Sequence, residues 1–147
     1  MSEKKRKPVF HEGPITSDFI ARSIQSHSTK HDIGGHSIFL GQVRADQKEQ
    51  ARVVAIEYTA YVQMAEDVMH AIREEIFSRY PLTCMHIHHS LGTVKAGEIC
   101  LFVFTSAAHR KEAIRACEEV VERIKKDVPV WGREILDDEN YLWKENS

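Results

Sequence analysis

The chain has 147 residues, a length that fits one domain and is too short for two ordinary ones. Hydrophobic residues make up 42% of it, enough for a core, and its formal net charge of −2 excludes nucleic-acid binding through overall charge. No apolar run approaches the roughly 20 residues of a membrane helix and no signal core follows the basic start, so a cytoplasmic protein is expected. The cysteines form no Cys-x-x-Cys pair and stand among apolar neighbours, so Cys84, Cys100 and Cys117 are predicted to be buried free thiols.

The first part of the chain is predicted to place a short helix among three strands. Residues 1–7 are expected to form a disordered basic tail, and residues 8–147 a single domain. Thr16 supplies N-cap chemistry for the helix, which carries a short apolar stripe. The strands are expected over residues 8–11, 36–44 and 53–59, with a charged loop over 46–50.

The second part is predicted to contain two long helices. Apolar residues spaced three and four apart indicate a helix over residues 61–80, which Pro81 ends. Ser106 is expected to cap the other helix. The buried face of that helix is predicted to consist of Ala113, Ile114, Cys117, Val120, Val121 and Ile124.

Strands are expected between and after these helices. The first two are joined through Gly92 and Gly97, and a polar turn precedes the last. Their predicted ranges are 83–89, 98–105, 129–135 and 141–143. Because strands and helices do not alternate strictly, the prediction is an α+β fold with a mostly antiparallel or mixed sheet.

The segment Ser106–Arg110 is the first candidate for binding chemistry. It is expected to place His109 and Arg110 in the first turn of a helix, where free N–H groups and the positive end of the helix dipole lie. A cation at this end of a helix is slightly unfavourable because it meets the positive end of the dipole. A bound anion would reverse this, since the dipole, the N–H groups and the arginine would all attract it. The segment therefore indicates an anion site, with two solvent-facing side chains as the alternative.

Two other cations stand at the ends of predicted elements. Lys125 follows Ile124 at the edge of the apolar helix face, where partial burial would suit it to act as nucleophile, base or electrostatic clamp. Arg44 ends a strand and can bind a phosphate or a carboxylate through two parallel hydrogen bonds. The ordinary alternatives are a lysine that complements a helix C-terminus and an arginine on the surface.

Histidines in one predicted strand raise the question of a metal site. His86 and His88 would share one face of that strand, which is an acceptable ligand geometry, and His89 follows them. No cysteine or carboxylate partner stands at a recognisable spacing. Surface or cross-strand histidines are therefore the preferred interpretation, and no metal site is predicted.

Taken in order, these segments resemble the large, catalytic subunit of molybdopterin synthase. The resemblance covers about residues 8–144. It is carried by Trp143 and by the stretches Gly34–Arg44, Ile56–Glu66, Leu91–Glu98, Ser106–Arg110 and Lys125–Glu134.

The resemblance implies a fold of the α/β hammerhead type with an added β subdomain. It also implies a dimer of large subunits, each of which binds a small ubiquitin-like subunit that ends in Gly-Gly with a C-terminal thiocarboxylate. This tail delivers sulfur to cyclic pyranopterin monophosphate, and two rounds give molybdopterin. The resemblance thus implies a sulfurtransferase that needs no metal or organic cofactor for this step.

The resemblance assigns site residues by their positions. Lys125 matches the principal catalytic lysine of the family, which acts either electrostatically or through a transient adduct. The residues expected to bind substrate are Gln42, Val43, Arg44, His109, Arg110, Lys125, Gly132, Arg133 and Glu134.

Gly132 departs from the family pattern, which has a second lysine directly after the tryptophan of this motif. Lys126 and Arg133 are the candidates to compensate, although Lys126 would point about 100° around the helix from Lys125. Two other functions stay open. One is a non-catalytic homologue that still binds the ubiquitin-like partner, and the other is a phosphate- or nucleic-acid-binding domain that uses the basic tail.

Overall fold

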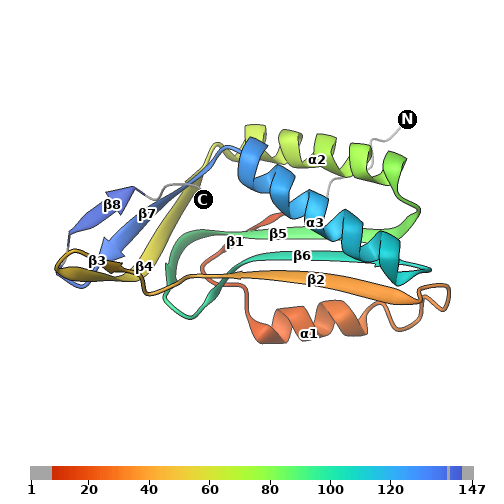
Figure 1. The fold of residues 1–147 in the computed structure, drawn as a ribbon, viewed down its shortest axis with the longest axis horizontal. Helices are drawn as coiled ribbons and strands as arrows, with labels where there is room; N and C mark the ends of the chain where they lie inside the picture. Colours follow the sequence, from red (N-terminus) through yellow and green to blue (C-terminus); the bar gives the residue numbers. More distant parts are fainter. Residues whose placement is uncertain (1–7, 139, 144–147) are drawn as a thin grey trace.

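Helices lie on both faces of the main sheet in the computed structural model (Figure 1). α2 (Val62–Arg79) and α3 (Arg110–Asp127) cover one face, and α1 (Ser17–Gln25) covers the other. The structure describes residues 8–138 and 140–143, so the predicted tail over residues 1–7 lies outside the described residues. None of the helices in these ranges is long and apolar enough to cross a membrane.

The strands form a mostly antiparallel sheet in the order β2-β6-β5-β4-β7-β8. Their bounds are β2 Gly35–Gln42, β4 Ala51–Ala60, β5 Leu82–Lys95, β6 Ile99–Ala107, β7 Val130–Leu136 and β8 Tyr141–Trp143. Two short strands join at the side: β1 (Phe10–Glu12) pairs in parallel with β5, and β3 (Gln47–Lys48) pairs with β4. The predicted α+β class with a mostly antiparallel, mixed sheet is confirmed.

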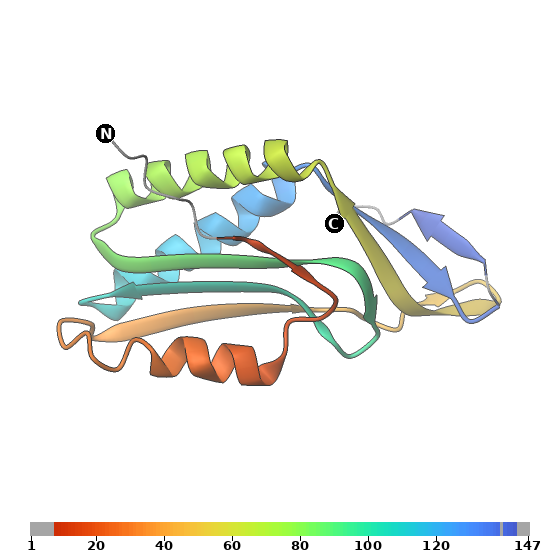
Figure 2. The same ribbon diagram turned by 180° about the vertical axis from the view of Figure 1, so that it is seen from behind.

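β5 connects the two parts of the sheet because it pairs with a different strand at each end. Its first half pairs with β6, and its last residues pair with β4. Gly92 lies between these parts with a φ of +80°, a conformation that favours glycine. Figures 1 and 2 show that β5 is strongly curved. The strands β3, β4, β7 and β8 then extend away from the helices as the added β region.

The prediction that Gly92 belongs to the connection between two strands is wrong. β5 continues through Gly92 to Lys95, and the turn to β6 forms at Gly97, which has a φ of +92°. The reason lies in tertiary pairing, since β4 supplies backbone partners to β5 beyond Gly92.

The larger core lies between the helix pair and the sheet. α2 contributes Met69, Ile72 and Ile76, and α3 contributes Val120 and Ile124. Burial of each such side chain stabilises the fold by about 1.5–3 kcal/mol. Ile114 was predicted to be buried but is 53% exposed, because it lies about 100° around α3 from Ala113; Ala116 is buried instead.

A smaller core lies between α1 and the opposite face of the sheet. Phe102 and Phe104 of β6 are fully buried there, and Phe19 and Ile20 of α1 pack against them. Thr16 caps α1 as predicted, since its side chain accepts a hydrogen bond of 3.1 Å from the Phe19 N–H.

Ser106 does not cap α3, contrary to the prediction. It is buried within β6, where its hydroxyl lies 2.7 Å from Nδ1 of His36. β6 extends through Ser106 because that residue pairs with strands on both sides, at His36 and at Cys84. The helix therefore begins later, at Arg110, with His109 as its N-cap residue.

Candidate functional site

His109 and Arg110 lie where the chain leaves β6 and enters α3. His109 has an extended backbone and makes no side-chain cap hydrogen bond, and Arg110 is the first helical residue. Both side chains are exposed. Gly35 of β2 packs closely against Arg110, since a Cβ atom on it would lie 3.2 Å from the Arg110 Cα atom. The helix start thus presents a histidine and an arginine to solvent above a tightly packed strand end.

Gln42, Val43 and Arg44 lie at the other end of β2. Val43 is 2% exposed, and its backbone is held by hydrogen bonds with Glu98 and Gly97 of 3.0 and 2.8 Å. Gln42 and Arg44, on either side of Val43 in the sequence, are exposed. The Nη2 atom of Arg44 lies 3.3 Å from Oδ2 of Asp46. An ion pair this exposed is weak, so the Arg44 guanidinium can exchange Asp46 for a bound anion.

Lys125 and Lys126 occupy the last turn of α3. Both are exposed, so Lys125 does not show the partial burial expected at the edge of the apolar face. The helix ends two residues beyond Lys125, where the Val128 N–H donates to the Ile124 carbonyl at 3.2 Å. Two ammonium groups therefore stand at the helix end that leads into β7.

Arg133 and Glu134 point to opposite faces of β7, because neighbouring residues alternate along a strand. Arg133 pairs with Glu57 at 2.7 Å, and its guanidinium lies 4.6 Å from the centre of the Tyr141 ring. Glu134 is 6% exposed and lies 3.7 Å from the Lys48 Nζ atom. The two residues therefore cannot line the same side of one pocket in this protomer.

Gly132 is packed against β4. A Cβ atom on it would lie 2.9 Å from Cγ2 of Ile56 and 3.3 Å from Cε1 of Tyr58. Ile56 is buried and branched at Cβ, so its methyl group has little freedom to move. The lysine that the resemblance implies at this position would therefore require the Ile56 side chain to move.

Tyr58 is a residue of this region that the sequence did not single out. Burial raises the pKa of its hydroxyl, and the nearby Cys100 thiol and Glu134 carboxylate raise it further, so Tyr58 stays protonated. Its cross-strand partner is Gly132. No local sequence signal reveals this contact, because it depends on the register between β4 and β7.

An exposed apolar surface next to β7 was also missed. The rings of Tyr61 and Trp131 lie 4.8 Å apart in an edge-to-face arrangement, and the two residues are 64% and 43% exposed. A shallow hollow of about 550 Å³ adjoins Tyr61 and is lined by Tyr61, Val62, Gln63, Met64 and Asp67. Exposed apolar surface of this kind is typical of protein–protein contacts.

The predicted site residues fall into two groups. Gly35 pairs with Ala107 at the His109 end of β2, and Gln42 pairs with Ile99 at the Arg44 end, so the strand separates the groups by roughly 23 Å. α3 returns along β6 and carries Lys125 to the Arg44 end, roughly 22 Å from Arg110. One protomer therefore brings Lys125, Arg44 and β7 toward one end of the molecule and leaves His109 and Arg110 at the other.

Comparison with known proteins gives consistent matches. A family model described as MoaE protein matches residues 13–127. A molybdopterin synthase catalytic subunit from Pyrococcus abyssi is 43% identical over 112 residues, which cover 76% of this chain and 74% of that protein. The protein of the same name from Oryza sativa subsp. indica is 42% identical over 113 residues, which cover 77% of this chain and 58% of the rice protein.

Solved structures with a similar fold include a molybdopterin synthase from Staphylococcus aureus. It superimposes with a TM-score of 0.81 and 31% sequence identity, over 93% of this chain and 96% of that chain. A complex of subunits 1 and 2 of molybdopterin-converting factor from Helicobacter pylori gives a TM-score of 0.79 over 93% of this chain and 89% of that chain. At 16% identity, this second likeness concerns the fold alone.

Proposed function

Because the chain belongs to the MoaE protein family, we propose that it is the catalytic subunit of a molybdopterin synthase. It would be a sulfurtransferase that converts cyclic pyranopterin monophosphate to molybdopterin. The family match over residues 13–127 carries this proposal, because it spans Arg44, His109, Arg110 and Lys125. These four residues are cations or can become cations, which suits an anionic substrate.

The proposed sulfur donor is a ubiquitin-like small subunit with a C-terminal Gly-Gly thiocarboxylate. The exposed apolar surface around Tyr61, Met64 and Trp131 supports a protein partner on this side of the molecule. This surface lies beside β7, which follows directly from the Lys125 end of α3. A tail bound along it would bring its end group toward Lys125.

In the proposed chemistry, Lys125 acts electrostatically. The thiocarboxylate sulfur attacks a carbon of the pterin precursor, and the bond from that carbon to its oxygen substituent breaks, with the electron pair leaving on the oxygen. A thioester then joins the partner's tail to the pterin. Water then adds to the acyl carbon, and the carbon–sulfur bond of the tail breaks to leave a carboxylate on the partner and a thiolate on the pterin. The Lys125 ammonium would stabilise the negative charge that develops on the acyl oxygen. A transient covalent adduct with Lys125 is the alternative role.

The substrate site is proposed to combine residues of two copies of the chain. The two groups of cations are separated by roughly 22 Å or more along β2 and α3, farther than one small pterin phosphate can reach. A dimer in which the His109 and Arg110 end of one copy meets the Arg44 and Lys125 end of the other would form a complete site. The start of α3 in one copy would then bind the anionic substrate next to Lys125 of the other copy.

A non-catalytic homologue that binds the ubiquitin-like partner is the second candidate. The close packing of Gly132 against Ile56 favours it, because a lysine there would have to displace the Ile56 side chain. Arg133 is a weak substitute, since it is already paired with Glu57. Lys126 is the better candidate to compensate, because it is exposed in the same helical turn as Lys125.

We also propose that the protein works in the cytoplasm. Cys84, Cys100 and Cys117 are free and buried, as the sequence predicted, and free thiols are usual in a reducing compartment. No metal or organic cofactor is proposed for the sulfur transfer itself.

A product assay tests the proposed function. The full chain would be mixed with a thiocarboxylated small subunit and cyclic pyranopterin monophosphate, and molybdopterin would be measured as its fluorescent oxidised derivative. Molybdopterin formation is the expected result. Partner binding without any product would favour the non-catalytic homologue, and the absence of both would contradict the proposal.

A further inference from the structure

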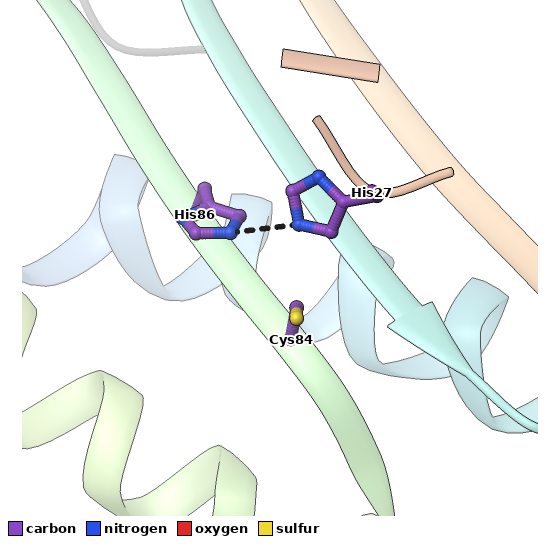
Figure 3. Close-up of side chains that lie close together, drawn as sticks. All are labelled: His27, Cys84 and His86. Carbon is purple, nitrogen blue, oxygen red and sulfur yellow. Dashed lines mark hydrogen bonds between the residues drawn. The ribbon is translucent and has the colours of Figure 1, made fainter. Parts of the chain in front are cut away.

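The sheet face beneath α1 carries a group of side chains with metal-binding chemistry, which the proposed sulfur transfer does not use. His27, Cys84 and His86 each offer one ligand atom, and these atoms lie within 4.8 Å of one another. Figure 3 shows the three side chains together, with His27 from the turn after α1 and the other two from β5. We propose that they form a binding site for Zn²⁺ or a similar transition-metal ion.

Cys84 and His86 are placed by the sheet. They are two residues apart on β5, so both side chains leave the strand on the same face. Their partners on β6 are Ser106 and Phe104, in the middle of the sheet. Because β6 pairs with β5 at both residues, the spacing of these two ligands is set before any ion arrives.

His27 is held in place by its backbone and by its ring. Its N–H donates to the Ile24 carbonyl, and its carbonyl accepts from the Lys30 N–H, both at 3.1 Å. The ring lies 4.8 Å from the Phe104 ring, measured between their centres, and the residue is only 7% exposed. A ligand buried in this way loses little conformational freedom when it binds an ion.

The hydrogen bonds of His27 also direct its lone pair toward His86. Nδ1 of His27 lies 2.7 Å from the Ser23 carbonyl oxygen, and a carbonyl can only accept, so this nitrogen carries the proton. In the neutral ring the lone pair is then on Nε2, which lies 3.1 Å from Nε2 of His86. A histidine that donates one N–H to a backbone carbonyl is the usual arrangement of a metal-bound imidazole.

The distances are close to those of a tetrahedral zinc site. Zinc–nitrogen and zinc–sulfur bonds of about 2.05 and 2.3 Å require about 3.3 Å between two nitrogens and about 3.6 Å between nitrogen and sulfur. The two histidine nitrogens already meet this requirement to within a few tenths of an ångström, at 3.1 Å. The Cys84 sulfur lies at most 4.8 Å from the other ligand atoms. It would therefore need to move closer to the nitrogens by no more than about 1.2 Å.

The donor set selects the class of ion. Two imidazole nitrogens and one sulfur suit Zn²⁺ and related ions, whereas Mg²⁺ and Ca²⁺ prefer oxygen ligands. Three protein ligands leave the fourth position of a tetrahedron for water. Binding releases the Cys84 thiol proton to solvent. Lys30 donates to the Cys84 sulfur at 2.8 Å, so the ion displaces this exposed ammonium group into solvent.

This inference departs from the expectation of no metal site. That expectation considered His86 with His88 and found no cysteine at a familiar spacing. The structure instead joins His86 to Cys84, two positions earlier on β5, and to His27, 59 residues away in sequence.

Zinc binding to the full chain without an affinity tag tests the proposal. After treatment with a chelator, the protein would be titrated with Zn²⁺ in a calorimeter, and one ion per chain is expected. Cys84→Ser and His86→Gln should each weaken binding at least about 10–100-fold, the loss that follows even from disturbing residues around a ligand. Cys100→Ser and His70→Gln are matched controls and should bind as the wild type does, because neither residue is near the cluster.

Cobalt provides a second readout on the wild-type protein, in case a substituted protein fails to fold. Co²⁺ at this site should give a thiolate-to-metal charge-transfer absorption and the strong visible bands of a tetrahedral ion. Lys30→Gln should bind Zn²⁺ more tightly, because it removes the competing cation. Absence of the charge-transfer band, or Zn²⁺ affinity unchanged by Cys84→Ser, would show that the cluster is a hydrogen-bonded histidine pair only.

Discussion

Lys125 lies in the last turn of α3 with its side chain exposed, outside the core. Lys125→Ala should therefore leave the fold intact. It should lower turnover at least about 100-fold, as expected when a group that stabilises a developing charge is lost. Turnover would be followed by molybdopterin formation, and the fold by circular dichroism. Lys111→Ala, an exposed lysine near the other end of the same helix, is the control and should lose much less. Near-normal turnover of Lys125→Ala would refute its catalytic role.

Arg110 and His109 stand at the start of α3, where an anion would meet the helix dipole and free N–H groups. Arg110→Ala and His109→Ala should each weaken binding of cyclic pyranopterin monophosphate by about 1–3 kcal/mol, the range for a lost hydrogen bond to a charged group. Calorimetry with the precursor measures this directly. Lys111→Ala changes the charge one residue further along and serves as the control. Equal affinity in all four proteins would contradict an anion site at this helix start.

Gly132 is tightly packed, since a Cβ atom on it would lie 2.9 Å from a methyl group of Ile56. Gly132→Ala should lower the free energy of unfolding by about 1–3 kcal/mol, the usual cost of overpacking. Urea denaturation measures this change. In an Ile56→Ala background the same substitution should cost less, because the contact is gone. An equal cost in both backgrounds would mean that Ile56 is not the obstacle.

At the scale of elements, His11 links β1 to β5 beneath α1. Its Nε2 lies 2.8 Å from Nδ1 of His88, and its ring packs against Phe19. Burial lowers the pKa of His11 below its usual value of 6.5. The unfolded chain therefore binds this proton more readily than the folded chain, so stability is present above pH 6.5 and is lost as the pH falls below it.

The expected outcome is a fall in melting temperature between pH 7.5 and pH 5.5 that is smaller in His11→Gln than in the wild type. Thermal unfolding followed by circular dichroism at both pH values gives the comparison. His70→Gln changes a histidine on the outer side of α2, which pairs with Glu74, and is the matched control. The prediction fails if both variants respond to pH as the wild type does.

At the scale of the whole molecule, the separation of Lys125 from Arg110 decides how a site could be assembled. The two residues lie at opposite ends of α3, so a site that uses both must draw them from two copies. Mixed dimers test this arrangement. A dimer of one Lys125→Ala copy and one Arg110→Ala copy would hold one doubly impaired site and one site with both wild-type residues.

Such mixed dimers should recover about half of the wild-type turnover, because one of the two sites is intact. The two variants would be co-expressed with different tags, and the mixed species would be purified through both. Each variant alone supplies the baseline. Turnover no higher than that of the separate variants would mean that each site takes both residues from one copy.

The sequence by itself indicated the family, the site residues to be tested and the order of the elements except β3. That strand, Gln47–Lys48, lies where a charged loop was predicted, because it pairs with β4. Thr16 as a helix cap and the helices ending near Pro81 and Lys126 follow from local signals, because capping and apolar periodicity act over a few residues. Where the local prediction failed, at Ser106 and Gly92, a neighbouring strand supplied backbone partners that extended an element.

Only the tertiary structure decided which residues meet. The strand register placed Ile56 and Tyr58 against Gly132, and the length of β2 separated Arg44 from Arg110. The same packing brought His27 to Cys84 and His86 across 59 residues of sequence. Contacts of this kind depend on how distant segments pair and pack, and no short-range pattern in the chain encodes them.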